Sequence, residues 1–354
     1  MTGKERVLTA MRRQVPDRVP KTFNLCPSQM ETFRKETGAD NPAEYFGFEI
    51  RGVSVRPPKE VRDFSRWLGD TTGLRVDEWG VGWSKTDSSF HFEMMRHPLQ
   101  NAGSAAEIEA YPFPDLDQDY RYEGIKERVE ALHGDGYAVT GGVSPLGGTI
   151  FWPPYKLRGM ETLLMDMIDG SPVATVLLER VTHICAVMAR RFAECGVDII
   201  HTADDLGTQK GLMVSKELYR KWLKEPMRKV VDAAKGVNPD VLVFFHSDGN
   251  VEELIPDFID VGIDILNPLQ PECMDVGKIK REFGNDLAFW GAVGTQTTMP
   301  FGSPEEVRLC VQELIDVVGK NGGFLVAPTH LVEPEVPWEN ILAFIEAVDE
   351  YGKY

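Results

Sequence analysis

Five side chains of types that bind metals or transfer protons lie at or just beyond the ends of predicted strands. His246 is the last residue of one strand and Asp248 follows it, and Asp204 follows another strand. His330 and Glu333 follow the last strand of the sequence. Imidazole and carboxylate groups bind Zn²⁺ and act as general acids and bases. The candidate catalytic residues are therefore Asp204, His246 and His330, and the candidate metal ligands are His246, Asp248, His330 and Glu333.

A wider set of polar and aromatic residues is predicted to line the same site. Some of them follow strands directly, and others lie in loops rich in Gly and Pro. Aromatic rings supply apolar walls for a small substrate, and amides supply hydrogen bonds that orient it. The candidate substrate-binding residues are Trp79, Trp83, Trp152, Tyr155, Asn267, Gln270, Trp290 and Gln296.

Each of these residues also has a purely structural explanation. An Asp at a strand end often caps the next helix, and Asp204 or its neighbour Asp205 would suit that role. Amide side chains often bond loop backbone, and tryptophans suit core packing as well as a pocket. A fold alone, however, does not require two histidines and several carboxylates to converge from consecutive strands. Their convergence favours a functional site.

The elements that would position these residues alternate between strand and helix. The predicted strands are 137–143, 197–201, 240–246, 263–267, 286–293 and 322–327. Apolar strands that alternate with helices are typical of a parallel sheet covered on its outer face. So many units favour a (β/α)₈ barrel of the TIM type, in which the C-terminal ends of the strands carry the active site. A doubly wound sheet is the alternative, but no GxGxxG turn follows a strand.

The first third of the chain has a less regular pattern. A helix is predicted at 4–13 and a strand at 19–23, followed by a region in which a hairpin carries Trp79 and Trp83. Later, SPEE at 303–306 has the spacing of a helix-starting capping box. Since no linker or low-complexity segment interrupts the sequence, one domain is expected to span all 354 residues.

Composition narrows the classes of function. The 55 acidic and 38 basic residues give a formal charge of −17, which would repel a nucleic acid. No stretch approaches the ~20 uncharged apolar residues of a membrane span, and the N-terminus has no apolar signal core. The five cysteines are scattered without a CxxC pair, which argues for reduced thiols. A cytoplasmic protein that binds neither nucleic acid nor membrane is expected.

Four stretches spread over nearly the whole chain resemble the uroporphyrinogen decarboxylase superfamily. They are KERVLTAMRRQVPDRVP, DDLGTQKGLMVSKELYRKWLKEP, FFHSDGNVEELIPDFIDVGIDILNPLQPE and PTHLVEPEVPWENILAFIEA. The resemblance implies a barrel enzyme. Relatives in this superfamily include decarboxylases that act on a porphyrinogen. They also include cobamide-dependent methyltransferases that move a methyl group between a small substrate and a corrinoid protein.

The stretch after the first predicted strand favours the methyltransferase branch. Decarboxylases of the superfamily resemble one another in an arginine-bearing RQAGRY-like segment here, whose guanidinium groups suit a tetrapyrrole with eight carboxylates. This sequence reads KTFNLCPSQMETF, with no arginine between Arg18 and Arg34. Together with the charge of −17, this argues against uroporphyrinogen as the substrate.

The resemblance also implies a zinc site. The methyltransferase branch often holds Zn²⁺ through an HxC pair after one strand and a cysteine after the last. Here the pair reads His246-Ser247-Asp248, and the last position falls near His330. Imidazole and carboxylate also bind zinc, and fewer thiolates leave the metal a better Lewis acid. We therefore expect zinc at these residues, with a site that holds no metal as the alternative.

The expected reaction is methyl transfer from a small methylated substrate, such as a methoxylated aromatic, to the corrinoid of a partner protein. The enzyme would improve the leaving group and exclude water. The expected partners are the corrinoid protein, the substrate and a second copy of the chain in a homodimer. One alternative is a cofactor-independent decarboxylase of a smaller cyclic acid, in which Asp204 and His330 handle protons. Another is a corrinoid- or tetrapyrrole-binding protein without catalysis.

Overall fold

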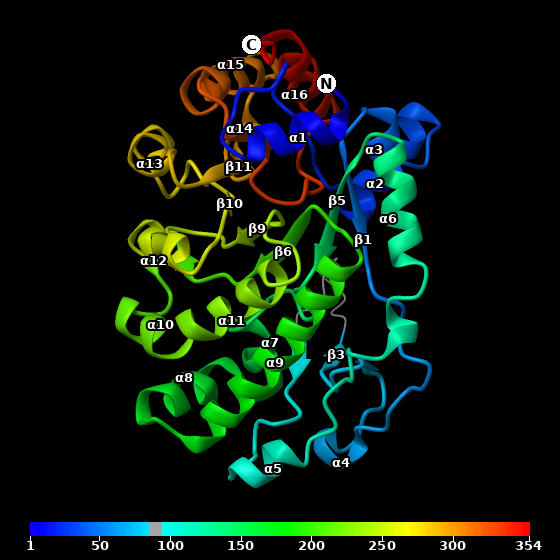
Figure 1. Ribbon diagram of the computed structural model, residues 1–354, viewed down its shortest axis with the longest axis vertical. Helices are drawn as coiled ribbons and strands as arrows, with labels where there is room; N and C mark the ends of the chain where they lie inside the picture. The colour runs from blue at the N-terminus through cyan, green and yellow to red at the C-terminus, as the bar shows by residue number, and fades with distance from the viewer. Residues whose placement is uncertain (85–93) are drawn as a thin grey trace.

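Seven parallel strands form one curled sheet in the computed structural model, which describes residues 1–84 and 94–354. In spatial order they are β1 (Ile50–Val53), β5 (Ala138–Gly142), β6 (Ile199–Ala203), β9 (Leu242–His246), β10 (Ile265–Asn267), β11 (Ala288–Val293) and β12 (Phe324–Pro328). Spatial order follows chain order, and helices on the outside connect the strands (Figure 1). The predicted TIM-type barrel of a single domain is confirmed.

The eighth position of the barrel is held by an extended segment without regular ladder pairing. Lys21 and Leu25 form isolated parallel bridges with Val326 and Val332, along the free edge of β12. The strand predicted at 19–23 is therefore in the right place, but it is paired only through these bridges. The predicted capping box is present, because Ser303 and Glu306 exchange hydrogen bonds at the start of α15.

Helices surround the sheet, and both chain termini lie at the same end of the molecule (Figure 1). The helices after the strands include α6 (Ile125–Gly134), α7 (Trp152–Arg158), α8 (Met160–Asp169), α9 (Pro172–Glu194), α10 (Lys216–Trp222), α11 (Lys224–Lys235), α12 (Ile255–Asp260), α13 (Val276–Phe283), α14 (Thr298–Phe301), α15 (Pro304–Leu314) and α16 (Trp338–Tyr351). Shorter helices of the first third are α2 (Pro27–Thr37), α3 (Pro42–Tyr45), α4 (Ser65–Leu68) and α5 (Ala105–Glu109).

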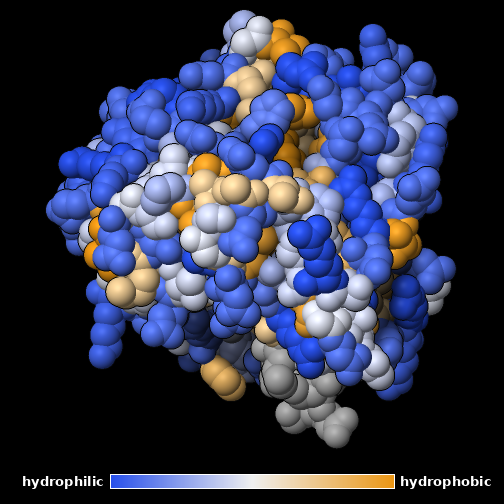
Figure 2. Space-filling view, turned by 90° about the horizontal axis from the view of Figure 1, so that it is seen from below, coloured by the Kyte–Doolittle hydropathy of each residue, from blue (hydrophilic) through white to orange (hydrophobic). Residues whose placement is uncertain are grey.

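One helix in the described part of the chain, α9, is long and apolar enough to span a membrane by composition alone. Its most apolar window is 56% buried in the fold, as expected of a helix that packs on the barrel. The face in Figure 2 is covered mainly by hydrophilic side chains, with smaller apolar areas between them.

Apolar side chains fill the barrel interior, beginning at the end where the strands start. Helix α1 (Gly3–Met11) lies across that end, and its fully buried side chains are Val7, Ala10 and Met11. Side chains alternate between the two faces of a strand, so Leu242, Phe244 and His246 of β9 all face the interior. The apolar layers end at Phe244. The polar layer that begins at His246 therefore lies at the C-terminal end, which we call the mouth.

The irregular first third adds a small antiparallel sheet of β2 (Arg75–Val76), β3 (Gly82–Ser84) and β4 (Met94–Arg96). This confirms a hairpin that carries Trp83, with Trp79 in the turn before it. The part of the predicted hairpin at 85–93 lies outside the described residues.

Candidate active site

The mouth brings together three of the predicted metal ligands. His246 ends β9, Asp248 follows two residues later, and His330 follows β12. Each offers one ligand atom, and the three atoms lie within 4.8 Å of one another. The closest measured pair is His246 Nε2 and Asp248 Oδ1, at 3.7 Å. We call these three residues the HDH cluster.

Asn267 fixes the orientation and tautomer of His246. Its amide nitrogen donates to the carbonyl oxygen of Trp290 at 2.8 Å, and a carbonyl oxygen can only accept. The amide oxygen must then face His246 Nδ1, from which it lies 2.5 Å away. Nδ1 therefore carries the proton and donates it to Asn267. This tautomer places the ring's lone pair on Nε2, which faces the cluster, as in histidines that bind metals.

The donor set fits a zinc ion. Zinc bonds to nitrogen and oxygen are about 2.0–2.2 Å long, so two ligands of a tetrahedral site lie roughly 3.3–3.6 Å apart. The 3.7 Å between His246 and Asp248 is close to this value. Burial raises the pKa of Asp248, nearby Asp205 acts in the same direction, and His246 opposes both. A cation among these groups would stabilise the charged carboxylate.

Asp205 also belongs to the site, although the sequence analysis did not choose it. Its Oδ1 lies 3.7 Å from His246 Nε2 and accepts the backbone N–H of Asp248 at 3.0 Å. Asp205 therefore holds the loop that carries Asp248. Two aspartates, Asp204 and Asp205, follow β6 in the sequence and indicate that a carboxylate belongs to the site. The sequence does not show which of the two faces the mouth.

Asp204 caps a helix, the structural role considered for it above, and is not part of the HDH cluster. It is 2% exposed, and four backbone N–H groups donate to its two oxygens. These come from the turn and first residue of α7, namely Thr149, Ile150, Phe151 and Trp152. Burial raises the pKa of Asp204 to about 7, and the N–H groups oppose that change because they stabilise the charged form. Its predicted catalytic role is corrected to that of a helix-capping residue.

Replacing Asp204 with alanine should destabilise the fold by roughly 3 kcal/mol, because the N–H groups of Ile150, Phe151 and Trp152 lose their acceptor. Urea unfolding would measure the loss. The exposed Asp63 also accepts a backbone N–H, that of Ser65, and Asp63→Ala is the matched control, with a cost near 1 kcal/mol or below. Equal stability of Asp204→Ala and wild type would contradict this role.

The predicted aromatic residues divide between core and mouth. Trp79 is 1% exposed and packs edge-on to Phe113, so its predicted contact with substrate is wrong. Trp83 and Trp152 are half-buried, and Trp152 stacks edge-on with Tyr155 in α7. Trp152 also donates from its indole nitrogen to the carbonyl of Asp205 at 3.4 Å. These three rings therefore form an aromatic wall beside the cluster.

The floor of the mouth is aromatic, and one side of it is open. Trp290 and His201 both contact Phe244, with ring centroids 5.0 and 4.1 Å from it. Burial and the neighbouring His246 lower the pKa of His201 to about 4, so its ring is neutral. Gly142 faces open space, since no atom lies within 4 Å of where a Cβ would stand. A small ligand has room beside β5.

Three other predicted residues lie away from the cluster. Gln270 is 4% exposed and accepts the N–H of Gly249, so it supports the loop rather than a substrate. Gln296 is exposed on the rim. Glu333 is not among the groups within 4.8 Å of each other, and its carbonyl accepts from Gln29. The prediction of Glu333 as a ligand is therefore not supported by the geometry.

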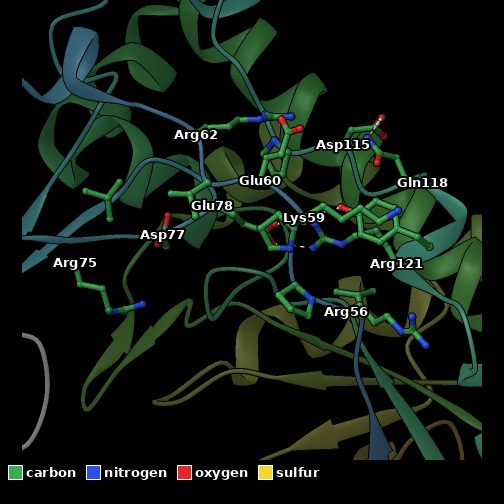
Figure 3. A pocket seen from close by; sticks show the side chains of 17 residues that line it. Arg56, Lys59, Glu60, Arg62, Arg75, Asp77, Glu78, Asp115, Gln118 and Arg121 are labelled. Carbon is green, nitrogen blue, oxygen red and sulfur yellow. Dashed lines mark hydrogen bonds and ion pairs between the residues drawn. The ribbon is translucent and has the colours of Figure 1, made fainter.

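A second cleft, of about 710 Å³, lies beside the small sheet between the segments 55–62, 75–78 and 114–121 (Figure 3). Its buried cation, Arg121, is paired with Glu78, whose two oxygens accept from the guanidinium at 2.9 and 3.0 Å. Among the described residues that line it, none is His or Cys. The mouth is the better candidate for metal-assisted chemistry.

Comparisons with solved structures support the fold. A methyltransferase from Methanosarcina mazei aligns with a TM-score of 0.69 over 99% of both chains, at 19% identity. At this level of identity the likeness concerns the fold alone.

Relatives in sequence fall into two kinds. A uroporphyrinogen decarboxylase of Pseudomonas fluorescens is 24% identical over 254 residues, which are 69% of this chain and 68% of that protein. A methylated-thiol–coenzyme M methyltransferase of Methanosarcina mazei is 26% identical over 213 residues, or 59% of this chain and 53% of that protein. The family model for uroporphyrinogen decarboxylase (URO-D) matches residues 99–351. The chain belongs to the uroporphyrinogen decarboxylase family.

Proposed function

We propose that this protein transfers a methyl group from a small methylated substrate to the reduced corrinoid of a partner protein. The observation that carries the proposal is the HDH cluster at the mouth, with the lone pair of His246 Nε2 directed into it. A methyltransferase among the sequence relatives supports the same reading. The proposed methyl donor is a methoxylated aromatic or a similar small molecule.

The residues of the mouth have separate tasks in this reaction. His246, Asp248 and His330 would hold zinc, which when bound supplies a Lewis acid for the leaving oxygen of the donor. Asn267 keeps His246 in the tautomer that can bind. The aromatic wall and floor exclude water and pack against the donor. The bond between the methyl group and oxygen would break with the electron pair left on oxygen, and the reduced corrinoid of the partner protein would supply the pair for the new bond to the methyl group.

The decarboxylase alternative is weakened by the position of Asp204. That reading uses Asp204 and His330 to handle protons, but both oxygens of Asp204 already accept backbone N–H groups of the turn at 149–152. The corrinoid-binding alternative predicts binding without turnover.

The test mixes the protein with reduced cobalamin, or with a reduced corrinoid protein, and a panel of methoxylated aromatics and methylamines. We expect the absorbance of the methylated corrinoid to appear with at least one donor and to depend on zinc. Demethylation that proceeds equally well without corrinoid would contradict the proposal. Carbon dioxide release from a carboxylated substrate in place of methyl transfer would favour the decarboxylase.

A further inference from the structure

Lys156 of α7 is held between two aromatic rings at the edge of the mouth. Its ammonium nitrogen lies 5.3 Å from the ring centroid of Trp83 and 5.0 Å from that of Trp152. It donates one hydrogen bond, of 2.5 Å, to the carbonyl oxygen of Leu146. Since the aromatic faces attract a cation, they hold the end of this flexible side chain in one place.

Among the residues that the structure describes, the ammonium of Lys156 has no ionic partner. Within the two described stretches of the chain, no carboxylate oxygen lies within ion-pair distance of Lys156, although Asp77 and Asp205 attract it from farther away. Burial lowers the pKa of Lys156. An ammonium has three donors, and only one meets a protein acceptor in the described residues. A largely buried charge without a counter-ion destabilises a fold. A ligand that supplies the counter-ion and accepts the remaining hydrogen bonds would therefore be bound strongly.

Lys156 is connected to the HDH cluster through two contacts. Trp152, which flanks the ammonium, donates to the carbonyl of Asp205, and the carboxylate of Asp205 lies 3.7 Å from His246. Three carboxylates near this point, Asp77, Asp205 and Asp248, would repel an anion. Arg75 is a second cation here, 5.8 Å from the ring centroid of Trp83, the side chain that also flanks Lys156. The whole chain has a formal charge of −17, and the mouth itself is acidic. Lys156 therefore provides a local positive charge to which an anion can bind.

We propose that Lys156 binds an anionic group of the methyl donor and so determines specificity for methoxylated aromatic acids. The carboxylate of the donor accepts the free N–H groups of Lys156, and its ring packs against the aromatic wall. This inference rests on the proposed methyl transfer, because it names the class of donor for the same site.

The first test measures binding without any corrinoid. The probes are 4-methoxybenzoate and its neutral isostere 4-methoxybenzamide, followed by calorimetry. We expect the wild type to bind the acid about 10- to 100-fold more tightly than the amide. Lys156→Met keeps an unbranched side chain between the rings and should abolish this preference. Lys156→Arg should keep most of it.

The matched control is Lys221→Met. Lys221 also places its ammonium over a tryptophan, 5.2 Å from the ring of Trp222, but it is exposed on α10. This variant should keep the preference of the wild type for the acid. A wild type that binds the two probes equally, or binds neither, would overturn the inference, as would an unchanged preference in a folded Lys156→Met protein.

The second test separates this inference from the proposed function. With the corrinoid acceptor present, the preference should appear mainly in KM, because Lys156 acts on binding rather than on the leaving group. Selective binding of the acid without methyl transfer to any acceptor would support the role of Lys156 and contradict the proposed reaction. Methyl transfer that does not distinguish acid from amide would support the reaction and overturn the role of Lys156.

Discussion

The His246→Ala variant is expected to lose bound zinc and to transfer methyl groups on the order of 10³-fold more slowly than the wild type. His246 supplies the ring nitrogen at the centre of the site, 3.7 Å from both Asp248 and Asp205. Without it, the remaining ligands are one carboxylate and the exposed His330. Two such groups are too few to hold zinc firmly, so the activation of the leaving group is lost.

Metal analysis of untagged protein, purified without chelator, gives the first measurement. The wild type should carry close to one equivalent of zinc per chain, and His246→Ala well under a tenth of that. His183→Ala is the control, because His183 is exposed on α9 and far along the chain from every ligand. Wild-type protein with almost no zinc, and with activity that chelators leave unchanged, would show that the HDH cluster works without a metal.

The barrel was predictable because its signals are local and repeated. Apolar strands and amphipathic helices alternate through most of the chain, and each unit independently indicates the same architecture. The first third lacked such repetition. The extended segment at 19–25 is defined by one bridge to Val326 of β12 and one to Val332 beyond it, both more than 300 residues away, and no local pattern reveals them. The buried position of Trp79 likewise depends on Phe113 and other distant residues.

The location of the site could be predicted from the sequence, but not every residue that belongs to it. Parallel strands end at one edge, so residues after β9 and β12 had to meet, as His246 and His330 do. The choice between Asp204 and Asp205 could not be made in the same way. This choice depends on the turn at 149–152. The N–H groups of the turn donate to Asp204, and Asp205 is left facing the mouth. Lys156 was missed because its position is set by side chains from two separate elements.

Replacing Asn267 with leucine is expected to weaken zinc binding and activity about 10- to 100-fold without removing any ligand. The amide oxygen of Asn267 accepts from His246 Nδ1, and its nitrogen donates to the carbonyl of Trp290. Leucine leaves His246 free to carry its proton on Nε2 or to rotate, so fewer molecules present a lone pair to the metal. The free energy of unfolding should also fall by about 1–3 kcal/mol, because buried polar groups lose their partners.

Two further variants separate orientation of the ligand from general destabilisation. Asn340 is 1% exposed and donates to the carbonyls of Met299 and Gly302, so Asn340→Leu should lose similar stability but keep the zinc affinity of the wild type. Asn267→Asp keeps an acceptor for His246 Nδ1, and its zinc affinity should stay within about tenfold of the wild type. Competition with a chromophoric chelator measures all four proteins. If Asn267→Leu binds zinc as tightly as Asn340→Leu, the amide does not set the tautomer of His246, and the cluster orients its imidazole by other contacts.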